Sequence, residues 1–322
     1  SAERRVELDE QRQLRTASAV AEELGHMKGA LMKLGQMASY LDEGLPEPLR
    51  MALAQLRSSA PPMSAELAAG VVEAELGMQP GDLFVEWDPQ PIAAASIGQV
   101  HRAIYADPDT GEQRAVAVKV QYPGVDEAIA ADLRNADMLG VLLKQGFGGL
   151  EPDEMVAEIK ERLTEELDYE LEARNQQVFA DFYRDHPYIH VPEVVPKLST
   201  GRVLATELVN GHTWDELLTW DQRERDLAGE TIFRFVFRSL YRMRAFNGDP
   251  HPGNYLFHGD GRVTFLDFGL VKHFTEPEMD TFKAMVRSAA VDHDAAEFRS
   301  IVERAGMLRP GAPATTDEVG EY

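Results

Sequence analysis

Four polar residues in this sequence have the types and spacing that could hold a metal-bound triphosphate. Lys119 ends an alternating apolar stretch, residues 116–119 (VAVK). Asp249 and Asn254 flank a Pro-His-Pro-Gly segment, and Asp267 follows a short apolar run. A lysine projecting from a strand can reach phosphates, and carboxylate and amide oxygens are the ligands that Mg²⁺ prefers. Each feature alone is better explained by an ordinary strand end or a simple turn.

The order and spacing of these residues favour chemistry over simple turns. A strand lysine, then an Asp-x-x-x-x-Asn segment, then Asp-Phe-Gly is the order of parts in a kinase active site. In that arrangement the first Asp acts on a hydroxyl nucleophile, while the Asn and the second Asp hold Mg²⁺. We therefore predict catalytic roles for Lys119 and Asp249, and metal-ligand roles for Asn254 and Asp267.

A phosphate-covering loop is expected before the lysine strand. The glycine-rich template of kinases fits residues 93–100 with Gly98 and Val100 kept, but Ala93 and Ala95 stand in place of the first two glycines. Glycine allows close backbone approach and positive φ, and alanine restricts both, so the loop should cover a nucleotide differently. The predicted nucleotide contacts in it are Ala93, Ala94, Ala95, Ser96, Gly98 and Val100.

Together these motifs resemble the UbiB/ADCK family of atypical kinases, also called AarF-domain proteins. The resemblance spans residues 33–271. Its motifs are Lys33-Leu-Gly-Gln36, the alanine-rich loop followed by His101, residues 116–124 (VAVKVQYPG), Glu166-Leu-Asp168, residues 249–254 and Asp267-Phe-Gly269. It implies an α+β, two-lobed protein-kinase-like fold with a helical N-terminal extension. It also implies binding of ATP or ADP with Mg²⁺ and, in many members, a link to isoprenoid lipids.

The resemblance also gives roles to acidic and polar residues. It implies that Glu172 pairs with Lys119, and that Glu166 and Asp168 meet the segment carrying Lys33 and Gln36, which occludes the place of a peptide substrate. We expect Glu166, Asp168 and Glu172 on one helix, residues 152–184, with Asp168 and Glu172 on the same face. Without the resemblance, solvated helix faces would explain these residues better.

Three features argue against a kinase of other proteins. His251 stands where a protein kinase usually carries lysine, and only residues 270–276 separate the Asp-Phe-Gly motif from the next predicted helix. No Ala-Pro-Glu signature and no room for a long activation loop are present. We expect a Mg²⁺-dependent ATPase or a phosphotransferase acting on a small molecule or lipid. The alternative is a nucleotide-gated lipid-binding or chaperone-like module with incidental catalysis.

Apolar periodicity predicts the elements that position these residues. Helices are expected at residues 8–41, 48–57, 64–77, 125–144, 152–184, 220–246 and 276–305. Strands are expected at 97–105, 114–121, 191–195, 203–208, 255–257 and 263–266. The predicted parts are an extension over 1–62, an N-lobe over 63–209 and a C-lobe over 210–322. Between the lobes, the backbone of Glu207 and Val209 is predicted to bind adenine.

Composition restricts partners and location. The chain has 322 residues and no cysteine, which excludes thiolate chemistry. Its formal net charge of −23 argues against nucleic-acid partners. No uncharged apolar run reaches the ~18–20 residues of a membrane span. We therefore expect a cytoplasmic protein, with peripheral association at the inner face of a membrane and an isoprenoid or other small-molecule ligand as further expectations. The oligomeric state stays open.

Overall fold

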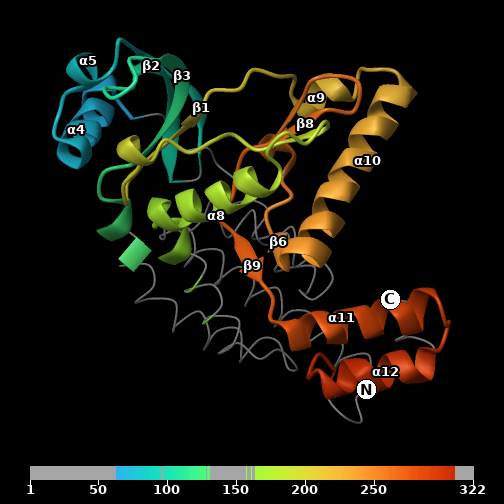
Figure 1. The fold of residues 1–322 in the computed structure, drawn as a ribbon. Coiled ribbons are helices and arrows are strands. Elements are labelled where there is room, and N and C mark those ends of the chain that lie inside the picture. Colours follow the sequence, from blue (N-terminus) through green and yellow to red (C-terminus); the bar gives the residue numbers. More distant parts are fainter. Residues whose placement is uncertain are drawn as a thin grey trace, which may run out of the picture.

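A computed structural model describes residues 63–95, 97–127, 129–130, 157, 161 and 164–308. An antiparallel sheet with short helices at its side forms one part of the fold, and helices with two small sheets form the other (Figure 1). This two-part α+β arrangement is the predicted fold class. The N-terminal extension and the predicted helices at 8–41 and 48–57 lie outside the described residues.

The N-lobe is built on four strands in the order β1-β2-β3-β5. Their bounds are β1 (Glu86–Ala94), β2 (Gly98–Ala106), β3 (Gln113–Gln121) and β5 (Val203–Glu207), and every neighbouring pair is antiparallel. Helices α4 (Ala65–Leu76) and α5 (Pro80–Leu83) lie beside the sheet in Figure 1. Buried valines of α4 and of β3 share one hydrophobic cluster, so α4 packs on the sheet through its apolar face.

The ends of α4 follow from two residues. Ser64 caps the helix by accepting a hydrogen bond from the backbone N–H of Leu67, as serine commonly does at this position. Gly77 ends it with φ 75°, a left-handed conformation that glycine adopts without steric cost. Both ends confirm the helix predicted at 64–77.

Strand β1 was not predicted. It contains Pro89 and Pro91, and proline lacks the N–H that a central strand needs. The structure places β1 at the edge of the sheet, with register shifts on either side of Pro91. An edge strand tolerates proline because one of its sides makes no hydrogen bonds to a neighbouring strand. The two prolines explain why the sequence did not predict a strand here.

The helix expected over 152–184 is interrupted inside the Glu166-Leu-Asp168 motif, since Glu166 is helical but Leu167 and Asp168 are not. Helix α8 runs Tyr169–Phe182, and Asp168 is its N-cap, with φ −102° and ψ 88° outside the helical region. Aspartate is a strong capping residue, so it begins a helix here. The prediction that Asp168 and Glu172 share a helix face is therefore wrong.

The prediction of a strand over 191–195 is also wrong. The structure forms a two-residue strand β4 (Ile189–His190), a single bridge between Val194 and Thr206, and a short 3₁₀ helix η1 (Pro196–Leu198). Pro192 and Pro196 remove backbone donors on either side, so a continuous ladder cannot form. Strand β5 confirms the strand predicted over 203–208, although it ends one residue earlier, at Glu207.

The C-lobe begins with α9 (Trp214–Leu217) and α10 (Gln222–Arg238). A single helix over 220–246 was predicted, but α10 passes into a π-helical turn, η2 (Ser239–Met243), and stops at Arg244, whose φ is 55°. The chain then forms strand β6 (Ala245–Asn247). This early stop leaves residues 245–247 to form a strand just before the predicted catalytic loop.

Three short strands and a 3₁₀ turn follow. The turn η3 (Pro252–Asn254) leads into β7 (Tyr255–Phe257), which pairs with β8 (Val263–Phe265) as the predicted hairpin. Strand β9 (Val271–His273) pairs with β6, and β4 pairs in parallel with β8. Helices α11 (Glu276–Ala290) and α12 (Ala295–Arg304) end the described chain. Residues far apart in sequence are thereby brought to the junction of the lobes.

An aromatic cluster holds this lobe together. The rings of Phe235 and Phe265 stack with centroids 3.7 Å apart, and Phe179 of α8 lies 4.9 Å from Phe268. Phe268 belongs to the Asp-Phe-Gly motif and is fully buried. Helix α8 therefore packs directly on the segment that carries Asp267.

A buried polar network joins the start of the described chain to β2. Gln99 accepts a hydrogen bond from Met63 N–H at 3.0 Å, and its amide nitrogen lies 2.9 Å from a ring nitrogen of His101. The other ring nitrogen of His101 is 2.9 Å from Asp88 O, and Trp87 stacks on the imidazole. The two nitrogens of His101 are thus both engaged inside the fold.

This environment makes the fold sensitive to acid at one residue. Burial lowers the pKa of His101 below its ordinary 6.5, although the Asp88 carbonyl acts in the opposite direction. The neutral ring therefore adds stability that is complete above pH 6.5 and is lost as pH falls through the folded-state value. We expect the difference in melting temperature between wild type and His101→Gln to shrink from pH 7.5 to pH 5. Thermal melts across this range check it, and a constant difference would contradict it.

Candidate active site

A buried ion pair between the N-lobe sheet and α8 lies at the centre of the site. Lys119 of β3 donates to both carboxylate oxygens of Glu172, at 2.9 and 2.8 Å. The two side chains are only 14% and 6% exposed. Helical spacing puts Glu172 on the inner face of α8 with Asn175, Gln176 and Phe179. The structure therefore brings together the lysine and glutamate that the sequence suggested.

Two further carboxylates converge on this pair. Asp267 Oδ2 lies 3.7 Å from Lys119 Nζ. A Cβ atom added to Gly269 would lie 3.3 Å from Asp267 Oδ1, 3.7 Å from Glu172 Oε2 and 3.8 Å from Glu166 Oε2. Gly269 thus lies where three acidic side chains meet, and Glu166 belongs to the site although it precedes α8.

The pKa values reflect this crowding. Burial lowers the pKa of Lys119, but the carboxylates of Glu172 and Asp267 outweigh it and keep the pKa well above its usual value. Burial raises the pKa of Glu172, Lys119 lowers it, and Asp267 raises it further, so the net direction is upward. The lysine is therefore a fixed positive charge, and Glu172 depends on it to remain ionised.

The catalytic-loop motif forms a compact turn. His251 caps the turn η3 by accepting from the backbone N–H of Gly253, and Asn254 N–H donates to His251 O. The side-chain nitrogen of Asn254 donates to Asp249 O at 3.2 Å. Asp249 is buried, with 6% of its surface exposed. The loop thus holds Asp249 and Asn254 in one rigid unit.

Asn247 is a positioning residue that the sequence analysis missed. Its side-chain nitrogen donates to Asp267 O at 2.8 Å, and its side-chain oxygen accepts from Asp249 N–H at 3.1 Å. The β6–β9 ladder and a bond from Gly248 N–H to Leu270 O fix the same neighbourhood. One amide therefore joins the two predicted acidic residues. Its position in the sequence, two residues before Asp249, was the signal from which this role could have been predicted.

Tyr169 is a second residue that was missed. Its ring lies 4.9 Å from Lys119 Nζ, and burial raises its pKa far above the usual range. Within the described part of the chain its hydroxyl is buried without a hydrogen-bond partner. The same hydroxyl would lie 2.8 Å from a Cβ atom on Gly98. A buried hydroxyl without a partner is unfavourable, so a polar ligand group or water is expected here.

The alanine-rich segment forms a tight hairpin between β1 and β2. Ala93 pairs with Val100, Ala94 pairs with Gln99, and Ala95 N–H donates to Gly98 O at 2.9 Å. A Cβ on Gly98 would lie 2.4 Å from Val120 O, so only glycine fits at this position. Ser96 lies outside the described residues.

Glu207 and Val209 lie where β5 leaves the sheet toward the C-lobe. The Glu207 N–H donates to Glu193 O, and its carboxylate lies 3.1 Å from a nitrogen of His190. Leu208 N–H donates to Ala115 O at 3.1 Å. The segment is thus the connection between the lobes, and adenine binding by it stays a prediction.

The remaining predicted residues divide into two groups. Asp168 does not face Lys119: its carboxylate accepts from Leu171 N–H and lies 3.7 Å from a nitrogen of Arg174, with 46% of the side chain exposed. Lys33 and Gln36 lie outside the described residues. Their contact with Glu166 stays a prediction.

The oxygen donors of the site fit a Mg²⁺–phosphate group. The Asn254 nitrogen is used inside the loop, which leaves its oxygen as the ligating atom. Among the residues that the structure describes, no three His, Asp or Glu side chains form a preformed metal cage. Mg²⁺ in phosphotransfer sites is usually held by one or two carboxylates together with substrate phosphates and water, so Asp267 and Asn254 suit it.

A strand lysine paired with a helix glutamate, followed by these two loops in one site, defines a protein-kinase-like protein. Residues 55–302 match the ABC1 atypical kinase-like domain. The chain belongs to this family, which confirms the resemblance to the UbiB/ADCK proteins.

Similar proteins span animals, fungi and bacteria. The atypical kinase COQ8B, mitochondrial, of Rattus norvegicus is 36% identical over 279 residues, covering 85% of this chain and 51% of that protein. COQ8 of Saccharomyces cerevisiae is 31% identical over 274 residues, covering 84% of this chain and 54% of that one. A solved complex of Rv3197 with erythromycin from Mycobacterium tuberculosis has a TM-score of 0.67 and 35% identity, covering 98% of this chain and 80% of that chain. The chain spans about half the length of these two curated relatives.

The Asn247 amide gives a test of how the site is held. Asn247→Asp keeps the size and the oxygen that accepts from Asp249, but it removes the donor to Asp267 O and sets a carboxylate against that carbonyl. We expect a loss of about 1–3 kcal/mol in the free energy of unfolding, measured by urea denaturation. Asn210→Asp makes the same change at an exposed position and should stay within about 0.5 kcal/mol of wild type. Equal effects from the two variants would rule out the bridging role.

Proposed function

We propose that this protein binds ATP or ADP with Mg²⁺ and uses it for slow ATP hydrolysis or for phosphoryl transfer to a small molecule or lipid. The observation that carries the proposal is Lys119, held between Glu172 and Asp267. Lys119 would contact phosphates, with Glu172 orienting it. Asp267 and Asn254 would hold Mg²⁺, which supplies charge stabilisation to the phosphates. Asp249 would act on the attacking hydroxyl or water.

The acceptor is proposed to be small rather than a peptide. Residues 271–273 after the Asp-Phe-Gly motif pair with β6, and α11 begins at Glu276. This leaves little chain between the motif and the helix for a peptide-docking activation loop. The Lys33-to-Gln36 motif of the sequence adds to this, because we propose that Lys33 and Gln36 cover the site by contact with Glu166.

A second function is a nucleotide-gated ligand-binding module. Alanines in the phosphate loop and the relationship to Rv3197, solved with erythromycin, favour it. In that case ligand binding changes with nucleotide, and hydrolysis is incidental. An isoprenoid lipid or another apolar small molecule is the proposed ligand in both cases. Phosphorylated product formed in proportion to ATP consumed would favour the transferase.

Location at a membrane surface is part of the proposal. Among the described residues no helix combines the length and apolar character needed to span a bilayer. Relatives are named mitochondrial in rat and yeast. A peripheral position, with a lipid ligand presented at the membrane surface, is compatible with these observations. A cytoplasmic location stays a prediction.

Loss of one metal-binding charge tests the nucleotide site. Asp267→Asn keeps the shape of the side chain but removes one negative charge from a hard-cation site. We expect the affinity for Mg²⁺–ATP to fall by about ten-fold or more, with a smaller effect on ATP without Mg²⁺. Thermal-shift and calorimetric titrations measure both.

Asp260→Asn is the matched control. Asp260 lies in the β7–β8 turn with φ 51°, a conformation that asparagine also tolerates, so its nucleotide affinity should equal that of wild type. A wild-type protein that binds no Mg²⁺–nucleotide would overturn the proposed function. An Asp267→Asn protein with unchanged affinity would remove Asp267 from the metal site.

A further inference from the structure

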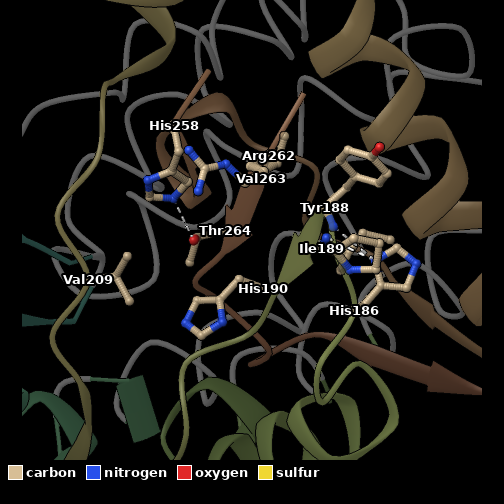
Figure 2. Close-up of a pocket in the computed structure, with 10 residues that line it drawn as sticks. His186, Tyr188, Ile189, His190, Val209, His258, Arg262, Val263 and Thr264 are labelled. Carbon is tan, nitrogen blue, oxygen red and sulfur yellow. Dashed lines mark hydrogen bonds between the residues drawn. The ribbon is translucent and has the colours of Figure 1, made fainter. Parts of the chain in front are cut away.

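An open pocket of about 240 Å³ lies outside the candidate active site, beside the connection between the lobes. Figure 2 shows the side chains around it. Its lining residues are His186, Pro187, Tyr188, Ile189, His190, Val209, His258, Arg262, Val263 and Thr264. Val209 is the one residue that it shares with the predicted nucleotide contacts. The cavity is therefore separate from the Lys119 cluster.

Three segments distant in sequence form its walls. Residues 186–190 come from the segment between α8 and the end of β4, Val209 comes from the interlobe connection, and residues 258–264 come from the β7–β8 hairpin. Ile189 and Val263 are buried and pair across β4 and β8. Because these two side chains have almost no exposed surface, the apolar surface open to a ligand is that of Val209 and Tyr188.

The polar groups of the cavity are basic. Its lining contains Arg262 and three histidines but no acidic residue, in a chain whose formal net charge is −23. Within the described part of the chain Arg262 makes no side-chain ion pair. Figure 2 places its guanidinium beside His258. An unpaired arginine next to a histidine attracts an anion.

The histidines are held in defined orientations. His258 Nε2 lies 2.8 Å from Thr264 Oγ1, and His190 Nε2 lies 3.1 Å from Glu207 Oε2. Burial lowers the pKa of His258, and the positive charges of Arg262, His190 and His212 lower it further. An anion near Arg262 would relieve this repulsion. Glu207 already serves His190, so Arg262 and His258 are the groups left to bind it.

Size narrows the class of ligand. Pockets for drug-sized ligands occupy ~300–1,000 Å³, so a cavity of about 240 Å³ is too small for a macrolide or a whole nucleotide. It suits a single ring or a short apolar chain with one charged end. Tyr188, with 46% of its surface exposed at the rim, offers an aromatic face to such a ring.

We propose that this cavity is a second ligand site, for a small organic anion that has an aromatic or short apolar body and one carboxylate or phosphate group. The charged group binds Arg262 and His258, and the body lies against Val209 and Tyr188. The occupant touches the interlobe connection through Val209 and the β7–β8 hairpin through Arg262 and His258. The site does not depend on the proposed nucleotide chemistry.

Three probes that share a phenyl ring show whether binding requires a negative charge or only the ring. The full chain is titrated with benzoate, with phenyl phosphate and with neutral benzamide, and the imidazole signals of His190 and His258 are followed by NMR. Assignment comes from His190→Gln and His258→Gln. We expect saturable shifts of both signals with at least one of the anions and none with benzamide. Arg262→Gln should weaken anion binding by roughly ten-fold.

Arg287→Gln is the control, because it removes the same charge from an exposed position on α11. It should bind the anions like wild type. Anions that leave both histidine signals unshifted would overturn the proposal. So would equal binding of benzamide, or an Arg262→Gln protein with wild-type affinity. If Arg262→Gln fails to fold, His258→Gln must show weaker anion binding, measured through the remaining His190 signal.

Discussion

The arrangement of the site depends on one buried ion pair. Moving a lysine and a glutamate out of water is costly, and only close, multiply bonded geometry offsets the cost. Lys119 and Glu172 meet this condition through two hydrogen bonds from one ammonium. Because one partner lies on β3 and the other on α8, the pair fixes the helix against the sheet.

Once α8 is fixed, it sets the position of the Asp-Phe-Gly segment. Asn175, one turn after Glu172, donates to Phe268 O at 3.2 Å, and Phe179 packs on the Phe268 ring. Asn247 holds the same segment from the other side through Asp267 O. The acidic residues of the two loops are thus held by backbone and amide contacts before any ligand binds. Such preorganisation is what phosphoryl transfer requires of a protein.

Sequence reasoning predicted the parts of this site that depend on residue type and order. Lys119, Glu172 and Asp267 come together as their motifs indicated, and the β2, β3, β7 and β8 strands were located closely. The sequence-based predictions failed where a local preference of a residue type was overridden by the fold or was not recognised. Asp168 was assigned to a helix interior, although aspartate caps helices, and β1 was missed because its prolines are acceptable only at a sheet edge. Tyr169 and Asn247 could not be found from periodicity, because their importance comes from contacts distant in sequence.

We expect Lys119 and Glu172 to act as one unit in binding nucleotide. A double-mutant cycle measures this directly, with Mg²⁺–ATP affinity determined for wild type, Lys119→Met, Glu172→Gln and the double variant. Breaking such a pair from one side costs about 3–5 kcal/mol when it is desolvated, so either single change should remove most of what the pair contributes. We expect the double variant to bind Mg²⁺–ATP no more weakly than Lys119→Met. Losses that simply add would show that the two residues act independently.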